Sequence, residues 1–244
     1  MFELGALRWP QADAGPRRLL VVPAGSCEQH GPHLPMDTDT RIAVAVASRA
    51  CVGRPGVGLA PAVAIGASGE HAAFPGTLSI GTEALALLLV ELGRHAARHW
   101  PAMLVVNGHG GNAAAIEAAQ RRLRAEGRNC HAWHAGLPAA ALAAVGLPAA
   151  DPHAGRFETS AMLALAPELV RLDLAVAGDT RPLGRIMPEL RSRGVRAVSS
   201  SGVLGDPAGA SAAEGERILA ALTAALAQAM QEVLAELAGH APPG

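Results

Sequence analysis

Glu28 and His30 are two side chains of the kind that bind metal ions, and one residue separates them. They follow the apolar run RLLVVPAG at 18–25, which is short, ends in Pro and Gly, and predicts a strand buried on both faces. In extended backbone, residues i and i+2 project to the same side, so one metal site could use both. Taken alone, the pair is better explained as a polar loop with a hydrogen-bonded His.

A carboxylate lies within reach of the same loop. Pro32 and Pro35 restrict the backbone after His30 and remove two backbone donors, which would hold Asp37 or Asp39 over the end of the strand. Either residue would supply a hard oxygen ligand.

The segment NGHGGN at 107–112 offers a second imidazole. His109 stands between glycines where a predicted strand turns into a helix, so its ring is expected at the carboxyl edge of the sheet, where ligands gather. The same turn could bind a phosphate at the helix N-terminus. Because G-x-G-x-x-G and a P-loop Lys are both missing, we favour a metal ligand.

The segment DPHAGRFETS at 151–160 carries three more polar groups, Asp151, His153 and Glu158. Glu158 by itself is also explained as a first-turn acid stabilised by the helix macrodipole. Together, the three segments supply Glu, His and Asp side chains, which form an oxygen and nitrogen ligand set for Zn, Mn or Fe(II) rather than a soft thiolate site. The set is large enough for two metal ions.

The elements that must position these residues alternate along the chain. Strands are predicted at 18–25, 57–66, 102–108 and 129–136, and helices at 39–52, 81–100 and 112–127. The last of these helices begins with Asn112, a good N-cap, and ends with Gly127, where a left-handed C-cap is expected. This alternation predicts an α/β fold with a mostly parallel sheet covered by helices.

Two further segments have biased composition. The Ala- and Pro-rich stretch 137–151 fits a loose helix or a mobile loop over a site. The run 218–237 is rich in Ala and Leu, but polar residues interrupt it, so we expect a packed helix and no membrane span. Since no repeat or linker stands out, we expect a single domain over 1–244.

The overall composition excludes several functions. Twenty basic and 21 acidic residues give a net charge of -1, so there is no broad positive field for nucleic acid or an anionic membrane. Three cysteines without a C-x-x-C pair argue against a disulfide framework and a thiolate zinc site. With no signal-peptide pattern at the N-terminus, we expect a cytoplasmic protein.

Four motifs in this order, EQHGPHLP-x-D-T-D, GEH-x-x-FPGT, NGHGGN and HAG-x-x-ETS, resemble the creatininase family of metal-dependent amidohydrolases. The resemblance implies a three-layer α/β/α fold with a metal pair at the strand ends. It assigns Glu28 and His109 to one metal ion and His30 to the second. Asp39 is the implied bridging carboxylate, whereas Asp37 falls at a variable position.

The chain departs from creatininase at one ligand position. Creatininase has a Glu two residues after the His of its N-G-H motif, and here that residue is Gly111. We expect Glu158 to replace it, as a metal ligand and a catalytic residue. His153 matches the proton-shuttling His of the family, and a purely structural role is its alternative. The residues expected to line the pocket or support the ligands are Glu70, His71, Asn107 and Asn112.

The resemblance is closer still to the peptidases of mycofactocin biosynthesis, through the long stretches around 66–94, 151–155 and 201–218. It implies cleavage of an amide bond that releases the modified, Val-Tyr-derived C-terminal dipeptide from a precursor peptide. Two divalent ions per subunit (Zn, Fe(II) or Mn) and a homo-oligomer, with six subunits common in the family, are also implied. A cyclic-amide hydrolase or formamide deformylase is the main alternative, and a non-catalytic binding module the second.

Overall fold

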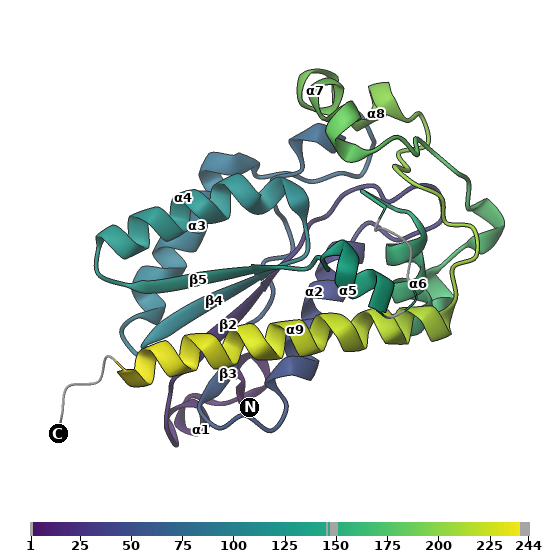
Figure 1. Cartoon of the computed structure of the whole chain (residues 1–244). Helices are drawn as coiled ribbons and strands as arrows, with labels where there is room; N and C mark the ends of the chain where they lie inside the picture. The colour runs from purple at the N-terminus through teal and green to yellow at the C-terminus, as the bar shows by residue number, and fades with distance from the viewer. Residues whose placement is uncertain (1, 145, 147–150, 240–244) are drawn as a thin grey trace.

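Five strands form the parallel sheet at the centre of the computed structural model, which describes residues 2–144, 146 and 151–239 (Figure 1). The strands are β1 (Phe2–Glu3), β2 (Leu19–Ala24), β3 (Val57–Leu59), β4 (Ala102–Asn107) and β5 (Asn129–His134). Their order in the sheet is β1-β3-β2-β4-β5, and every neighbouring pair is parallel. The predicted α/β class is confirmed.

Helices cover both faces of the sheet (Figure 1). Leu19 and Val21 of β2 pack on the side of α2 (Thr38–Cys51) and α9 (Ala212–Gly239). Leu20 and Val22, whose side chains point the other way, pack with α3 (Gly81–Ala96) and α4 (Ala113–Ala125). Both faces of β2 are therefore buried, as its continuous apolar sequence predicted, and the three-layer α/β/α arrangement is confirmed.

The remaining helices lie at the sheet margins or beyond its carboxyl end. They are α1 (Trp9–Asp13), α5 (Ala139–Ala144), α6 (Arg156–Leu165), α7 (Leu183–Arg193) and α8 (Val195–Val198), with the 3₁₀ turns η1 (Leu4–Ala6), η2 (Gly69–His71), η3 (Gly110–Asn112), η4 (Pro167–Leu169) and η5 (Leu172–Leu174). Helix α5 accounts for part of the biased stretch 137–151. Residues 145 and 147–150 of that stretch lie outside the described residues.

Two local predictions were wrong. The strand predicted at 57–66 ends at Leu59, because Pro61 has no backbone N–H to donate and only a single bridge, from Val63 to Ala24, follows it. Asn112 does not cap α4 with its side chain, which binds other segments instead. Gly127, in contrast, has the predicted left-handed backbone, with φ of 72° after the end of α4.

The connections place the site between β2 and β4. The chain leaves β2 toward α2 on one face of the sheet and leaves β4 toward α4 on the opposite face. The last residues of the two strands, Ala24 and Asn107, are direct partners in the sheet. Such a switch point between adjacent strands leaves a crevice beyond their carboxyl ends, where α/β proteins bind ligands.

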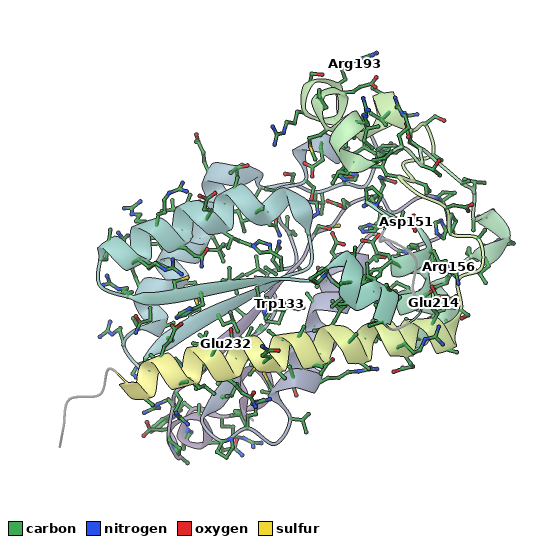
Figure 2. The ribbon with its side chains drawn as sticks, in the orientation of Figure 1. Trp133, Asp151, Arg156, Arg193, Glu214 and Glu232 are labelled. Atoms are coloured by element: carbon green, nitrogen blue, oxygen red, sulfur yellow. The ribbon has the colours of Figure 1, made fainter. Side chains whose placement is uncertain are left out.

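Helix α9 packs beside α2 on the same face of the sheet and contacts α6. Its length and composition would also allow a membrane span, a test that core helices of soluble proteins pass as well. One stripe of the helix, including Ile218, Leu222 and Leu226, is fully buried in the core. Near the start of α9, Glu214 forms an ion pair with Arg156 of α6 (Figure 2). This ion pair links α6 to α9.

Candidate metal centre

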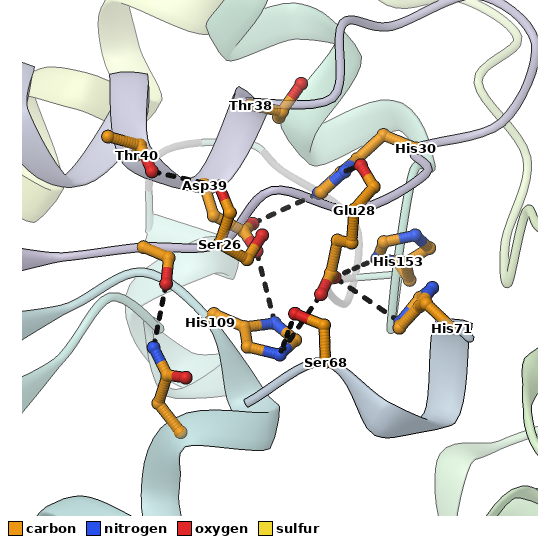
Figure 3. Close-up of polar contacts among 12 residues, drawn as sticks. Ser26, Glu28, His30, Thr38, Asp39, Thr40, Ser68, His71, His109 and His153 are labelled. Atoms are coloured by element: carbon orange, nitrogen blue, oxygen red, sulfur yellow. Dashed lines mark hydrogen bonds and ion pairs between the residues drawn. The ribbon is translucent and has the colours of Figure 1, made fainter. Parts of the chain in front are cut away.

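The Glu28 carboxylate is buried at the centre of the site and accepts no hydrogen bond from any described residue. Three imidazoles surround it (Figure 3): His109 Nε2 lies 3.1 Å from Oε2, and His71 Nε2 lies 3.3 Å from Oε1. His153 Nδ1 is 3.9 Å from Oε1. A buried carboxylate without hydrogen bonds is costly unless it is paired or binds a cation, so this geometry points to a metal ligand.

Asp39 lies between two of the predicted ligands. Its Oδ1 is 3.1 Å from His30 Nε2, and its Oδ2 is 3.1 Å from His109 Nδ1 (Figure 3). Ser26 Oγ donates a hydrogen bond of 2.8 Å to Oδ2. Asp39 stands in the first turn of α2, where the helix dipole favours a negative charge. Asp37, the other candidate, turns outward and pairs with Arg41.

Opposite charges at this point shift the pKa values of Asp39, His30 and His109. Burial favours the neutral form of all three, but the mutual attraction outweighs it. Asp39 raises the pKa of His30 to about 10 and, with Glu28, raises the pKa of His109 well above its usual range. Beside these imidazoles, the pKa of Asp39 lies well below its usual range. A divalent cation could take the place of the protons, because metal ligands must be deprotonated.

Glycines and amides allow the two strand ends to approach. A Cβ on Gly108 would lie 2.5 Å from the backbone oxygen of Asp39, so only glycine lets the β4 turn pass against α2. The Asn107 side chain donates to the backbone oxygen of His109. Asn112 donates to Gly25 O and accepts from the Ala67 backbone N–H. These two amides hydrogen-bond to the loops that carry the predicted ligands.

His153 reaches the site from outside the sheet. Its backbone exchanges two hydrogen bonds with Leu204, and its ring lies 4.3 Å from the His30 ring between centroids. Nε2 lies 2.8 Å from the backbone oxygen of Gln29, which can only accept, so Nε2 carries the proton. The lone pair of Nδ1 therefore faces Glu28. Burial, with the nearby His30, lowers the pKa of His153 well below its usual range.

Glu158 lies near His30, in the first turn of α6. Its Oε2 accepts a hydrogen bond of 2.6 Å from the Ala154 N–H and lies 3.9 Å from His30 Nε2. Burial raises the pKa of Glu158 to about 7, although the adjacent His30 works against this. Ala154 has a left-handed backbone with φ of 52°, a conformation that non-glycine residues rarely adopt.

The structure brings together all of the predicted ligands, and adds residues to which the sequence analysis gave a lesser role or none. His71 faces Glu28 directly rather than only lining a pocket. The Gln29 amide nitrogen lies 2.9 Å from His71 Nδ1, which can accept a hydrogen bond from it. The same nitrogen lies 3.0 Å from His153 Nε2, which carries a proton and cannot accept. His71 belongs to the quoted motif GEH-x-x-FPGT, and Gln29 stands inside EQHGPHLP, so the sequence did contain a signal for both.

Three groups of ligand atoms in the described residues could hold a divalent ion. They are Glu28, Asp39 and His109; Glu28, His71 and His153; and His30, His153 and Glu158. All use imidazole nitrogen and carboxylate oxygen, the set that Zn, Mn and Fe(II) accept. Phosphate binding by the glycine turn is disfavoured, because the carboxylates of Glu28, Asp39 and Glu70 face the same place.

Known proteins share both the sequence and the fold. The family model Creatininase, described as creatinine amidohydrolase, matches residues 5–230. The chain is 53% identical over 208 residues to the protein of Mycolicibacterium smegmatis (strain ATCC 700084 / mc(2)155) named "Mycofactocin precursor peptide peptidase", covering 83% of this chain and 80% of that protein.

Two solved structures are similar along nearly their whole length. The one named "Creatininase Mn" has a TM-score of 0.75 and 28% identity, and covers 94% of this chain and 97% of its own. A Zn-Zn type of a creatininase mutant has a TM-score of 0.76 and 28% identity, and covers 94% and 96%. The chain thus belongs to the creatininase family of amidohydrolases, which hydrolyse C–N bonds.

Proposed function

We propose that this protein is a metal-dependent peptidase that releases the modified, Val-Tyr-derived C-terminal dipeptide from the mycofactocin precursor peptide. The observation that carries the substrate is the 53% identity to a protein named for that peptidase. The chemistry is supported by the buried Glu28 carboxylate, which accepts no hydrogen bond from the described residues and faces three imidazoles. Amide hydrolysis is also the activity after which the family is described.

We propose that two divalent ions bind here, with Zn, Fe(II) or Mn as the candidates. Glu28 and His109 would hold one ion and His30 and Glu158 the other, with Asp39 between them because its two oxygens face different imidazoles. Divalent ions at such a site lower the pKa of water and polarise a carbonyl oxygen. The names of two similar structures, a Mn form and a Zn-Zn form, are consistent with this proposal.

His153 would move the proton. With Nε2–H fixed on the Gln29 backbone oxygen, its Nδ1 lone pair can accept the proton of the attacking water. The same nitrogen then donates that proton to the departing nitrogen as the C–N bond breaks. The lowered pKa keeps the ring neutral at neutral pH, so the Nδ1 lone pair is available. His153→Gln should therefore lose turnover by about 100-fold or more while both ions still bind.

The test is incubation of metal-loaded protein with the modified precursor peptide, with the C-terminal fragment followed by mass spectrometry. Release of the dipeptide by the wild type, and its loss in His153→Gln, is the expected result. Creatinine and a formamide serve as parallel substrates, because a small-amide hydrolase is the alternative function. Hydrolysis of either without peptide cleavage would overturn the proposed substrate.

We also propose a single domain over 1–244, a cytoplasmic location and assembly into a homo-oligomer, with six subunits as the first arrangement to test. Leu87 and Leu88 on α3 are exposed and apolar, which supports burial against another subunit. The three free cysteines, Cys27, Cys51 and Cys130, fit a reducing compartment. Light scattering coupled to gel filtration would measure the number of subunits.

A further inference from the structure

The space beside Gly111 is filled by the side chain of another motif. A Cβ on Gly111 would lie 2.5 Å from Glu70 Oε1, 2.4 Å from His109 Nε2 and 2.4 Å from the Ala67 backbone oxygen. None of these distances is possible for a real Cβ, so a larger residue could not stand at 111 while Glu70 holds its position. The glycine therefore makes room for the Glu70 carboxylate next to His109.

Glu70 and Glu28 converge on the same nitrogen atom. Glu70 Oε1 lies 3.4 Å from His109 Nε2, and Glu28 Oε2 lies 3.1 Å from it, while Asp39 approaches Nδ1 of the same ring. Within the described residues, His109 is the only cationic partner of Glu70. Three carboxylates around one imidazole repel one another, and this repulsion is relieved when a cation with more than one charge binds among them.

The Glu70 side chain also has a defined orientation at the edge of the site. It belongs to the turn η2, directly before His71, which faces Glu28. About a third of the side chain is exposed, so it lies between the buried ligands and solvent. Burial raises the pKa of Glu70, and the neighbouring carboxylates of Glu28 and Asp39 act in the same direction.

We propose that Glu70 supplies an additional carboxylate ligand to the ion held by Glu28, Asp39 and His109, in the space left open by Gly111. This inference rests on the metal-dependent hydrolase proposed above. It adds to the centre a residue to which the sequence analysis gave only a supporting or pocket-lining role. It also accounts for the glycine at 111 through a neighbouring residue, whereas Glu158 lies at the other side of the site, beside His30.

The test is a titration of metal-free protein with Mn(II), followed by electron paramagnetic resonance and calorimetry without any peptide. Glu70→Gln keeps the shape of the side chain and removes its charge. We expect this variant to bind one of the two ions about 10- to 100-fold more weakly than the wild type. The control, Glu83→Gln, changes an exposed Glu of α3 and should bind both ions as the wild type does.

Thermal unfolding provides a second readout. Metal-free Glu70→Gln should be at least as stable as the wild type, because a repelling charge is gone, but added Mn(II) should raise its Tm less. Unchanged affinity for both ions would overturn the inference, and equal loss of stability with and without metal would show a purely structural role. Tight binding through Glu70 without peptide cleavage would overturn only the proposed substrate, and a wild type that binds no ion would overturn both.

Discussion

The two halves of the metal centre are built differently. The strand-end group is defined here as Glu28, Asp39 and His109, whose exposed fractions are 0, 3 and 5%. Glu28 and His109 come from the loops after β2 and β4, and Asp39 comes from the first turn of α2. The outer group is defined here as His30 and Glu158, the proposed ligands of the second ion, together with His153 beside them. Glu158 and His153 come from a segment that is not part of the sheet. Glu158 is also more exposed, at 19% of its side chain.

This difference means that the sheet holds one half in place, whereas loop contacts hold the other. The strand-end group rests on β2 and β4, adjacent parallel strands that are paired up to their last residues. In the outer group, His153 depends on a single bridge to Leu204, and Glu158 depends on the N–H of Ala154. We therefore expect the strand-end group to be preorganised for an ion and the outer group to respond to changes in the loops.

The largest effect should follow Glu28→Gln, because this residue lies at the centre of the site and faces both groups. Loss of its charge should weaken binding of both ions and lower kcat/KM by about 1000-fold or more, since metal assistance is worth several kcal/mol. Metal content by mass spectrometry and peptide cleavage measure the two consequences. A variant that keeps both ions and full turnover would show that Glu28 is not a ligand.

Glu158→Gln should weaken ion binding only at the outer group. We expect one ion to bind as in the wild type and the other to bind about 10- to 100-fold more weakly, with a matching loss of turnover at limiting metal. Glu168→Gln, at an exposed position after α6, is the control for removing a charge in this region. Equal loss of both ions would contradict the division of the centre into two groups.

The same division explains what could be predicted from the sequence. Glu28, Asp39 and His109 were placed at one edge because strands of alternating α/β segments are parallel, so their carboxyl ends meet. Pattern alone left Asp37 and Asp39 equivalent. The structure separates them because residue 39 lies in the first turn of α2 and faces inward, whereas residue 37 precedes the helix and pairs with Arg41.

Contacts between segments distant in the chain could not be predicted in this way. Asn112 was expected to cap its own helix, a local rule, but its amide binds Gly25 and Ala67 across the site. Likewise, no local pattern places the Gln29 amide between His71 and His153, or Glu70 beside Gly111. Such contacts arise from tertiary packing, which overrides local preference.

A smaller effect, on stability, is expected from His33, which links the loop after β2 to α6. His33 lies on that loop, and its Nε2 lies 2.9 Å from Thr159 Oγ1 of α6. Burial lowers the pKa of His33 to about 4, below its ordinary value of 6.5. The unfolded chain thus binds more protons between pH 6.5 and 4. Stability is fully present above pH 6.5 and falls as the pH drops toward 4, by at most about 3 kcal/mol from this group.

Urea unfolding at several pH values would measure this effect. His33→Gln should lose less stability than the wild type as the pH falls from 6.5 to 4, because glutamine does not titrate there. Identical pH profiles would show that His33 is not responsible. His71 and His153, whose pKa values are also lowered by burial, should leave a remaining acid sensitivity in both proteins.

Thr159→Val should have the smallest effect and the most selective one. Valine keeps the shape of the buried threonine but leaves His33 Nε2 without its partner, at a cost of about 1 to 3 kcal/mol in the free energy of unfolding. Thr223→Val is the matched control, because the Thr223 hydroxyl is buried without a hydrogen bond among the described residues, so its removal should be neutral or stabilising.

The hydrogen bond between His33 and Thr159 also links α6 to the loop after β2. Thr159→Val should therefore weaken binding of the ion at His30 and Glu158 by several-fold and leave binding of the ion at Glu28 and His109 unchanged. Equal weakening of both ions would mean that the sheet, and not the contact between the loops, positions the outer group.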